Sequence, residues 1–397
     1  MKNFSFLACL LLVASCSDDH PRDPRTTATD IPHVNITTAS NVSIDEEYVA
    51  GEVSIMEGTR TSFTGPMRIK VRGNSSAGYP KKPYRIKLDA SSEVLGLAKN
   101  KDWVLLANFL DETLLTNAIA LKTASLLDMP FTNHIIPVDV SINGVYAGSY
   151  NLTEQVETGK NRVDVEPNGQ LLELDQYFDE TWQFRSAQFD LPVMIHYPKL
   201  TSETQLPPIQ NQFDILTALM TDPSFPENNY LDYIDQQSII NFFVVMLMTD
   251  NEELNHPKSI FLYKPAGGKY HLGPVWDFDW GFGFERDFTH FSTHSYPLFW
   301  SPVNNFSGGS FFSRFLEDPH VKAELLQTWS TFKTTKLPLL LEYVDDYSKR
   351  IASSYKRDYV RWKSQQGDRS PELNAEYIKN WLVNRAAFID TYLADLP

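Results

Sequence analysis

The feature that most constrains the fold is an apolar run at residues 239–248, Ile-Ile-Asn-Phe-Phe-Val-Val-Met-Leu-Met. Asp235 is typical of a helix N-cap, so we predict a helix from Gln236 to about Thr249. Because this helix would be apolar on nearly every face, it has to lie deep in a core, surrounded by other elements. A chain of 397 residues, 42% of them hydrophobic, is long enough to build such a core as one large domain or two smaller ones.

Upstream of this helix the sequence is rich in β formers. Asn143-Gly144 lies between two strand runs and is a strong hairpin signal, and Asp111 is a candidate cap for a helix that reaches about residue 127. We therefore predict a β-rich part over residues 32–175. Its strand runs, separated by turn residues, are 34–38, 52–56, 67–71, 84–88, 103–107, 138–142, 145–152 and 171–174.

The second part of the chain, residues 176–397, is predicted to be mainly helical. Residues 176–230 read as loop-rich with helical pieces, and residues 260–272 read as a hairpin. Ser370-Pro371 is a good helix start. The expected fold class is therefore α+β. The buried face of the last helix is marked by Ile378, Leu382, Ile389 and Leu393.

The N-terminus is typical of an export signal. Lys2 precedes a short apolar run at residues 4–13, which is too short to span a bilayer. Residues 12–16 end on Cys16 and resemble a lipoprotein processing site, so we expect residues 1–16 to be a signal peptide and Cys16 to carry lipid. An ordinary signal peptide with a chance cysteine is the alternative. Residues 17–31 are polar and read as a flexible tether.

These features predict a cell-envelope protein, lipid-anchored to the outer membrane and periplasmic or surface-exposed. Cys9 and Cys16 are the only cysteines, so the exported domain has neither a disulfide nor a cysteine-ligated metal. The net charge of −15 argues against nucleic acid and against an anionic membrane surface as partners. The lipid would then be the only link to a membrane.

Residues 276–283, Trp-Asp-Phe-Asp-Trp-Gly-Phe-Gly, carry the strongest chemical signal. Carboxylates among so many aromatic side chains are costly unless something pairs with them. Oxygen ligands of this kind suit Mg²⁺ or Mn²⁺, so Asp277 and Asp279 are candidate metal ligands. The alternative is a strand end whose aspartates cap backbone amides. His290 and His294 have the spacing of metal ligands on a helix, but their neighbours indicate a loop.

The order of these parts is that of protein kinases. A polar glycine-containing loop at residues 72–82 precedes a strand that bears Lys87, and a buried helix, a polar loop, a hairpin and Asp277 follow much later. In kinases such a loop covers the phosphates, the lysine holds them, and the later aspartate binds metal. The alternatives are a solvated basic turn and an exposed strand lysine that shares its face with Arg85.

Several motifs resemble those of the spore-coat protein H (CotH) kinase family, in family order from about residue 60 to 285. They are Arg72-Gly73-Asn74-Ser75-Ser76, residues 81–88, residues 102–108, residues 111–117, residues 143–150 with residues 154–156, Arg162-Val163, and residues 274–279. That family consists of atypical protein kinases that transfer phosphate from ATP to serine of exported or cell-surface proteins. The resemblance implies a kinase-like fold with a β-rich N-lobe and a mainly helical C-lobe.

The resemblance also implies roles for individual residues. Lys87 would bind the ATP phosphates, and Glu154 could orient that lysine. Asp277 would bind Mg²⁺ or Mn²⁺, with Asp279 supporting it. Arg72, Asn74, Ser75 and Ser76 would lie over the nucleotide.

The catalytic loop, residues 249–259, departs from the family pattern. Anchored on the following strand, Glu253 falls near the catalytic aspartate, and Lys258 and Ser259 fall near the metal-binding asparagine. Spacing alone instead fits the kinase pattern with Asp250 as the catalytic acid and Asn255 as the metal ligand. The two alignments differ by three residues, and both stay open at this point.

The expected function is ATP- and metal-dependent phosphotransfer to Ser or Thr of an exported protein. A catalytically degenerate kinase fold that binds a surface glycan or protein is the second hypothesis, favoured by the departure at Glu253 and Lys258. Metal-assisted hydrolysis by Asp277 and Asp279 is the third, although no partner histidine or nucleophile is recognisable.

Overall fold

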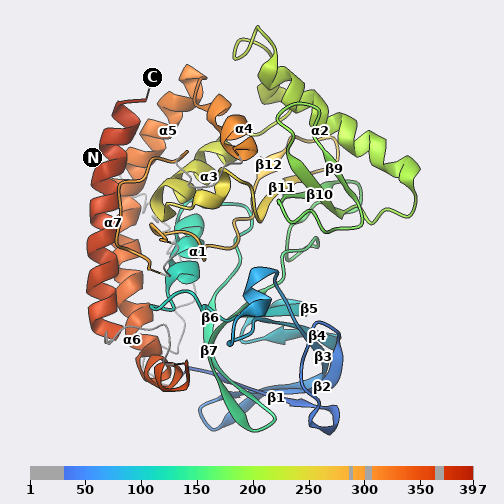
Figure 1. The fold of residues 1–397 in the computed structure, drawn as a ribbon, viewed down its shortest axis with the longest axis vertical. Coiled ribbons are helices and arrows are strands. Elements are labelled where there is room, and N and C mark those ends of the chain that lie inside the picture. The colour runs from blue at the N-terminus through green and yellow to red at the C-terminus, as the bar shows by residue number, and fades with distance from the viewer. Residues whose placement is uncertain (1–30, 286–288, 300–305, 363–370, 397) are drawn as a thin grey trace, which may run out of the picture.

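The computed structural model describes residues 31–285, 289–299, 306–362 and 371–396. The chain is a mixed α+β protein with a β-barrel at one end and a mainly helical part at the other (Figure 1). The predicted α+β class is therefore confirmed. The predicted signal peptide, Cys16, the tether up to residue 30 and Ser370 lie outside the described residues. No helix in the described ranges combines the length and the hydropathy that crossing a bilayer would need.

The β-rich part is a closed seven-stranded barrel in the order β1-β2-β3-β4-β5-β7-β6. The barrel closes because β1 pairs in parallel with β6, while its other pairs are antiparallel. Alternate side chains fill the interior, among them Val34, Ile69, Ile86 and Val138. The strands are β1 His33–Thr38, β2 Val49–Glu57, β3 Arg60–Val71, β4 Tyr84–Val94, β5 Leu97–Leu106, β6 Ile136–Ile142 and β7 Val145–Glu154.

The predicted hairpin between β6 and β7 is confirmed. Asn143 and Gly144 have φ of +50° and +78°, the left-handed pair that a two-residue turn between twisted strands requires. The predicted helix after Asp111 begins later than expected, as α1 Thr116–Leu126. Asp111 instead organises the preceding turn, because its carboxylate accepts from the backbone N–H groups of Thr113 and Thr116, each at 2.8 Å.

A second, five-stranded sheet follows the barrel in the order β12-β11-β8-β10-β9. The predicted strand at residues 171–174 and the predicted hairpin at residues 260–272 both belong to it. The region predicted as loop-rich contains two further strands and a long helix. The elements are β8 Gln170–Leu174, β9 Gln183–Arg185, β10 Pro192–Tyr197, β11 Ile260–Lys264, β12 His271–Leu272 and α2 Leu206–Thr221.

The predicted buried helix is the centre of the helical part. It is α3, Gln236–Thr249, and Asp235 caps it by accepting from Ser238 N at 2.8 Å. Every residue from Ser238 to Thr249 is buried, and α3 contacts α1, α5, α7 and β12. The remaining helices are α4 Ser307–Phe315, α5 Pro319–Thr331, a π-helical turn Phe332–Lys336, α6 Leu337–Trp362 and α7 Pro371–Ala394.

The long helices α6 and α7 lie side by side along one edge of the molecule (Figure 1). Ile378, Leu382, Ile389 and Leu393 of α7 are all buried, as predicted. The N-terminal half of α6 packs in the helical part, and its C-terminal half reaches the barrel strand β7. Helix α6 therefore joins the two parts of the molecule.

A buried ion pair fixes the contact between α6 and the barrel. Lys81, in the loop before β4, lies 2.7 Å from Asp358 of α6, and both side chains are buried, at 1% and 0% exposed. Lys81 also donates to Ser149 O, and Ser149 N donates to the Asp358 carboxylate. Gly148 fits beside this pair only because it has no side chain, since a Cβ there would lie 2.5 Å from Asp358 Oδ1.

Candidate functional site

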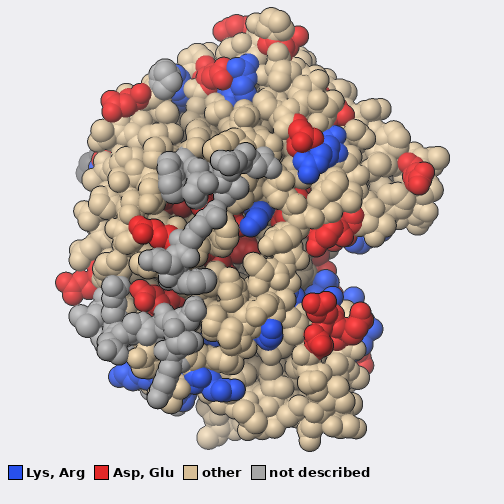
Figure 2. Space-filling view, viewed as in Figure 1, with Lys and Arg blue, Asp and Glu red and all other residues tan. Residues whose placement is uncertain are grey.

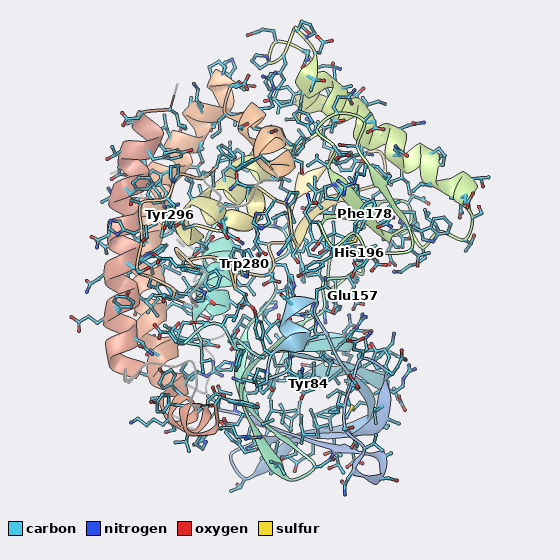
Figure 3. All side chains as sticks on the ribbon, viewed as in Figure 1. Tyr84, Glu157, Phe178, His196, Trp280 and Tyr296 are labelled. Carbon is cyan, nitrogen blue, oxygen red and sulfur yellow. The ribbon has the colours of Figure 1, made fainter. Side chains whose placement is uncertain are left out.

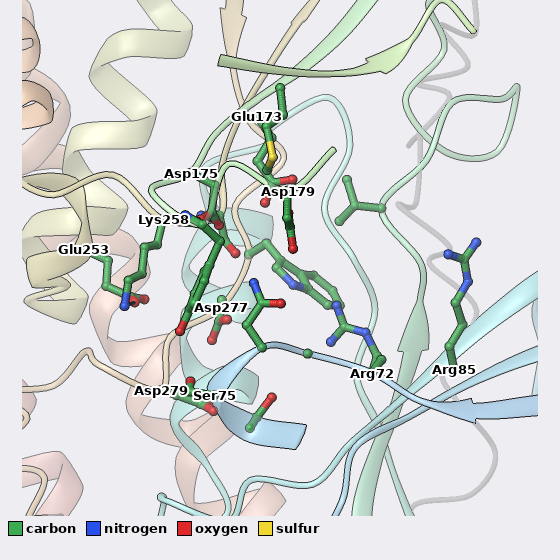
Figure 4. Close-up of a pocket in the computed structure, with 18 of the residues that line it drawn as sticks. Arg72, Ser75, Arg85, Glu173, Asp175, Asp179, Glu253, Lys258, Asp277 and Asp279 are labelled. Atoms are coloured by element: carbon green, nitrogen blue, oxygen red, sulfur yellow. Dashed lines mark hydrogen bonds and ion pairs between the residues drawn. The ribbon is translucent and has the colours of Figure 1, made fainter. Parts of the chain in front are cut away.

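A cavity of about 560 Å³ lies between the barrel and the second sheet. Figure 2 shows the molecule hollowed at this point, with acidic and basic side chains on both rims. In Figure 3, Tyr84 marks the barrel, and His196 and Trp280 mark the opposite part. Figure 4 shows the cavity close up. The candidate residues that line it are Arg72, Asn74, Ser75, Ser76, Glu253, Asp277 and Asp279.

The barrel supplies a tight turn after β3. Arg72 N donates to Pro83 O at 3.1 Å, which closes the base of the loop, and residues Ser75–Gly78 form a short 3₁₀ helix. Gly73 has a φ of +87°, and a Cβ there would lie 2.1 Å from Ser76 Oγ, so the turn requires glycine. Gly73, Asn74, Ser75 and Ser76 of this turn line the cavity, so their polar groups lie where an anionic ligand would bind.

Arg72 is the cation that this turn brings to the candidate metal site. Its guanidinium lies over the Trp276 ring, 5.5 Å from the centroid. Burial lowers the pKa of Arg72, while the Asp277 carboxylate acts in the opposite direction. An arginine nevertheless stays protonated, so Arg72 presents a permanent positive charge beside Asp277.

The segment from Asp277 to Asp279 is held in an unusual conformation by amide side chains. Asp277 has a φ of +61°. Asn251 Nδ2 donates to Asp277 O at 3.1 Å, and Asn117 Nδ2 donates to Asp279 Oδ1 at 3.0 Å. His290 Nε2 lies 2.8 Å from Asp279 O. Asp277 and Asp279 both line the cavity. The Asp277 carboxylate also has a hydrogen bond with the backbone of Asp279, so the alternative that the aspartates cap backbone amides describes part of its surroundings.

Burial disfavours the charged forms of both carboxylates, and the nearby Arg72 offsets that cost only in part. Burial, followed by the neighbouring Asp277 charge, raises the pKa of Asp279 to about 7. Burial also raises the pKa of Asp277, although Arg72 opposes that shift. A cation near both groups would relieve this cost.

The donor set fits Mg²⁺ or Mn²⁺ bound together with a nucleotide. Mg²⁺ is usually held by one or two carboxylates, with substrate phosphates and water completing its ligands. Asp277 and Asp279 supply such a pair. Within the described residues, no three or more His, Cys, Asp or Glu side chains gather as a metal site by themselves. His290 and His294 belong to no such group either, and they lie in a loop, as predicted.

The loop after α3 separates the two candidate catalytic acids. Asp250 ends the helix in a left-handed conformation, with φ of +49°, and its carboxylate points to Arg385 of α7 at 3.0 Å. Burial raises the pKa of Asp250 to about 6, opposed by Arg385. Glu253 instead lines the cavity, in a 3₁₀ turn where its N–H donates to Asn251 Oδ1.

Glu253 therefore has the position that a group acting on a ligand needs, and Asp250 has a structural partner. Burial, followed by Asp277, raises the pKa of Glu253 well above its ordinary value. Asn255 is fully buried, and its Nδ2 donates to Glu252 O and Leu298 O, each at 3.3 Å. The geometry favours the alignment that places Lys258 and Ser259 beside the cavity.

Lys87 and Glu154 are not brought together by the fold. Lys87 lies on the outer face of β4, 3.6 Å from Asp102, and Arg85 on the same face lies 2.7 Å from that carboxylate. Glu154 is buried against His134, at 2.7 Å. Neither Lys87 nor Glu154 is among the described residues that line the cavity. Their cofactor roles stay predictions, and on this face Arg85 is nearer to the site.

Sequence reasoning missed the acidic wall that the second sheet adds. Asp175 lines the cavity, and its carboxylate accepts from Tyr177 N at 2.7 Å and from Ser259 N at 3.0 Å. Burial, followed by the nearby Glu173, raises the pKa of Asp175 to about 7. Its place one residue after a predicted strand was the available signal, because side chains at strand ends often line sites.

The fold and site thus define a mixed α+β protein with an acidic, metal-compatible cleft closed on one side by a glycine-containing turn. The family described as CotH kinase protein matches residues 69–389. Since this match spans most of the sequence, the chain belongs to the CotH kinase family. A search of curated proteins finds no match.

Proposed function

We propose that this chain is an atypical kinase that transfers phosphate from ATP to Ser or Thr of another exported protein. The observation that carries the proposal is the convergence of Glu253, Asp277, Asp279 and the turn at residues 72–76 on one cavity. Family membership supports nucleotide and divalent-metal use in general. A kinase-like fold, with the barrel side as N-lobe and the helical side as C-lobe, belongs to the proposal.

In this proposal the barrel turn and Arg72 hold the phosphates. Asp277 and Asp279 would hold the Mg²⁺ or Mn²⁺ ion, which supplies positive charge to the phosphates when bound. The hydroxyl oxygen of the acceptor forms a bond to the γ-phosphorus, and the bond from that phosphorus to the β–γ bridging oxygen breaks, leaving ADP. Glu253 takes the hydroxyl proton. Catalysis is then mainly positioning and charge neutralisation.

The proposed location is the cell envelope, with the protein anchored to the outer membrane by a lipid on Cys16. The sequence features at residues 1–31 support it. The acceptor would then be another exported protein, since it has to meet the cleft in the same compartment. Metabolic labelling with a fatty acid, beside a Cys16→Ala variant, tests the anchor. Equal labelling of both chains would refute it.

The kinase proposal is tested with the full-length chain purified in detergent. Wild type and Asp277→Ala are incubated with Mn²⁺ and γ-labelled ATP, with and without a serine-rich peptide library. The proposal expects label on wild-type samples alone and an ATP-induced thermal shift that the variant lacks. If wild type shows neither label nor thermal shift across several metals, the degenerate binding module replaces the kinase. The ion pair of Lys258 with Glu253 is the observation that favours that second function.

A further inference from the structure

Lys258 holds a position in the cleft that the proposed mechanism has not used. Its ammonium lies 3.7 Å from Glu253 Oε1 and 4.3 Å from the centroid of the Trp280 ring. The Tyr177 ring lies at 5.3 Å. The side chain is only 19% exposed, so the two rings and the glutamate fix the charge at the cavity wall.

The loop that carries Lys258 is anchored at several points. Lys258 N donates to Glu253 O at 3.3 Å, and Ser259 N donates to Asp175 Oδ2 at 3.0 Å. Pro257 O accepts from Gln176 N at 2.9 Å. A lysine on a loop held this way presents its charge at a defined place, at low further cost in side-chain entropy.

Lys258 also stands opposite the cations of the barrel. Of the Lys and Arg side chains among the described lining residues, the others are Lys70, Arg72 and Arg85, all from β3, β4 and the turn between them. Figure 4 shows Asp277 between Lys258 on one side and Arg72 on the other. Both cations counter the rise in the pKa of Asp277 that burial causes. A triphosphate beside Asp277 would therefore meet fixed positive charge from both walls.

We propose that the Lys258 ammonium takes the place of a second divalent cation and contacts the terminal phosphates of the bound nucleotide. This inference rests on the proposed function. The kinase pattern has a metal-binding asparagine near this position of the loop, and this chain has a lysine whose charge is already in the cleft. The chain accordingly needs a single metal ion, at Asp277 and Asp279.

The experiment compares full-length wild type with Lys258→Met and Lys258→Asn. Methionine keeps the contacts with the rings and removes the charge, and asparagine restores an amide ligand. Lys264→Met, on β11 and outside the described lining of the cavity, is the matched control. Circular dichroism melting checks that each variant folds. Two quantities are measured: ATP affinity with EDTA present, and the number of Mn²⁺ ions bound per chain with a non-hydrolysable ATP analogue.

Wild type and the Lys264 control are expected to bind ATP without metal and to take one Mn²⁺ per chain with the analogue. Lys258→Met should lose about tenfold or more in metal-free ATP affinity, the range of one hydrogen bond to a charged group. Lys258→Asn should take a second Mn²⁺. Two ions on wild type, or unchanged metal-free affinity in Lys258→Met, would overturn the inference while leaving the kinase proposal intact. Wild type that binds no nucleotide under any condition would overturn both.

Discussion

The buried pair of Lys81 and Asp358 should be among the most costly contacts to break. The perturbation is Asp358→Asn, which keeps the shape and the acceptor for Ser149 N–H but removes the charge. Lys81 would then be a buried ammonium, 1% exposed, without its counter-ion. Burial already lowers the pKa of Lys81, with Asp358 opposing that shift. Removing one partner of such a pair costs about 3–5 kcal/mol.

That loss is a large fraction of the roughly 5–15 kcal/mol by which a folded protein is typically stable. The assay is guanidinium unfolding followed by tryptophan fluorescence, for wild type, Asp358→Asn, Lys81→Met and the double variant. Each single variant should lose about 3–5 kcal/mol, and the double variant should lose clearly less than the sum, because neither charge is then left alone. A single-variant loss below about 1 kcal/mol, or strictly additive losses, would refute the reasoning.

Three further predictions concern the site, the contact between His134 and Glu154, and the core. If Glu253 takes the acceptor proton, Glu253→Gln should lower kcat by about 10²–10⁴, whereas Asp250→Asn should mainly lower the unfolding midpoint; equal kcat losses in single-turnover labelling would contradict this. The hydrogen bond with Glu154 raises the pKa of His134 above 6.5. Burial raises the pKa of Glu154, but its hydrogen bonds and the charge of His134 outweigh burial and lower that pKa below 4.5. The stability from His134 is therefore full below pH 6.5 and lost as pH rises through its folded pKa, and that from Glu154 is full above pH 4.5 and lost as pH falls through its folded pKa. Both contributions are full between pH 4.5 and 6.5, so His134→Gln should lower the melting temperature in that window and flatten its decline above and below the window; an unchanged profile would refute the pair. Phe243→Ala, at a fully buried position of α3, should cost about 3–5 kcal/mol in urea unfolding; a loss below about 1 kcal/mol would show that the core refills the space.

The core of the fold was predictable because its signals are local. The apolar run around Phe243 and the cap at Asp235 defined α3 to the residue. Asn143-Gly144 defined the β6–β7 hairpin in the same way. Helix α2 was predicted only as helical pieces of unstated position in a loop-rich region, although Ile209, Phe213, Leu216 and Met220 follow a helical period and are buried. Two successive prolines lie at its start, where proline suits the first turn of a helix.

The candidate site was only partly predictable because its contacts are long-range. Residues 72–76 and Asp277 could be found from the order of parts along the chain. Spacing could not choose between Asp250 and Glu253, because the left-handed turn at Asp250 directs its side chain away from the cavity. Lys87 was predicted from the order of kinase parts and from the family resemblance, yet a register in which Lys87 faces Asp102 across β4 and β5 cannot be read from that strand alone.

The contact of Arg385 with Asp250 has a consequence for how the site comes into being. Arg385 is fully buried in the last helix, and it also donates to Leu247 O, His294 O and Tyr296 O. A chain made from its N-terminus acquires this arginine only after the barrel, the second sheet and α3 have been made. Until then, the loop that carries Glu253 lacks its contact with α7. A copy that stops before Arg385 would lack this contact, and its Asp250 would be buried without the arginine that faces it.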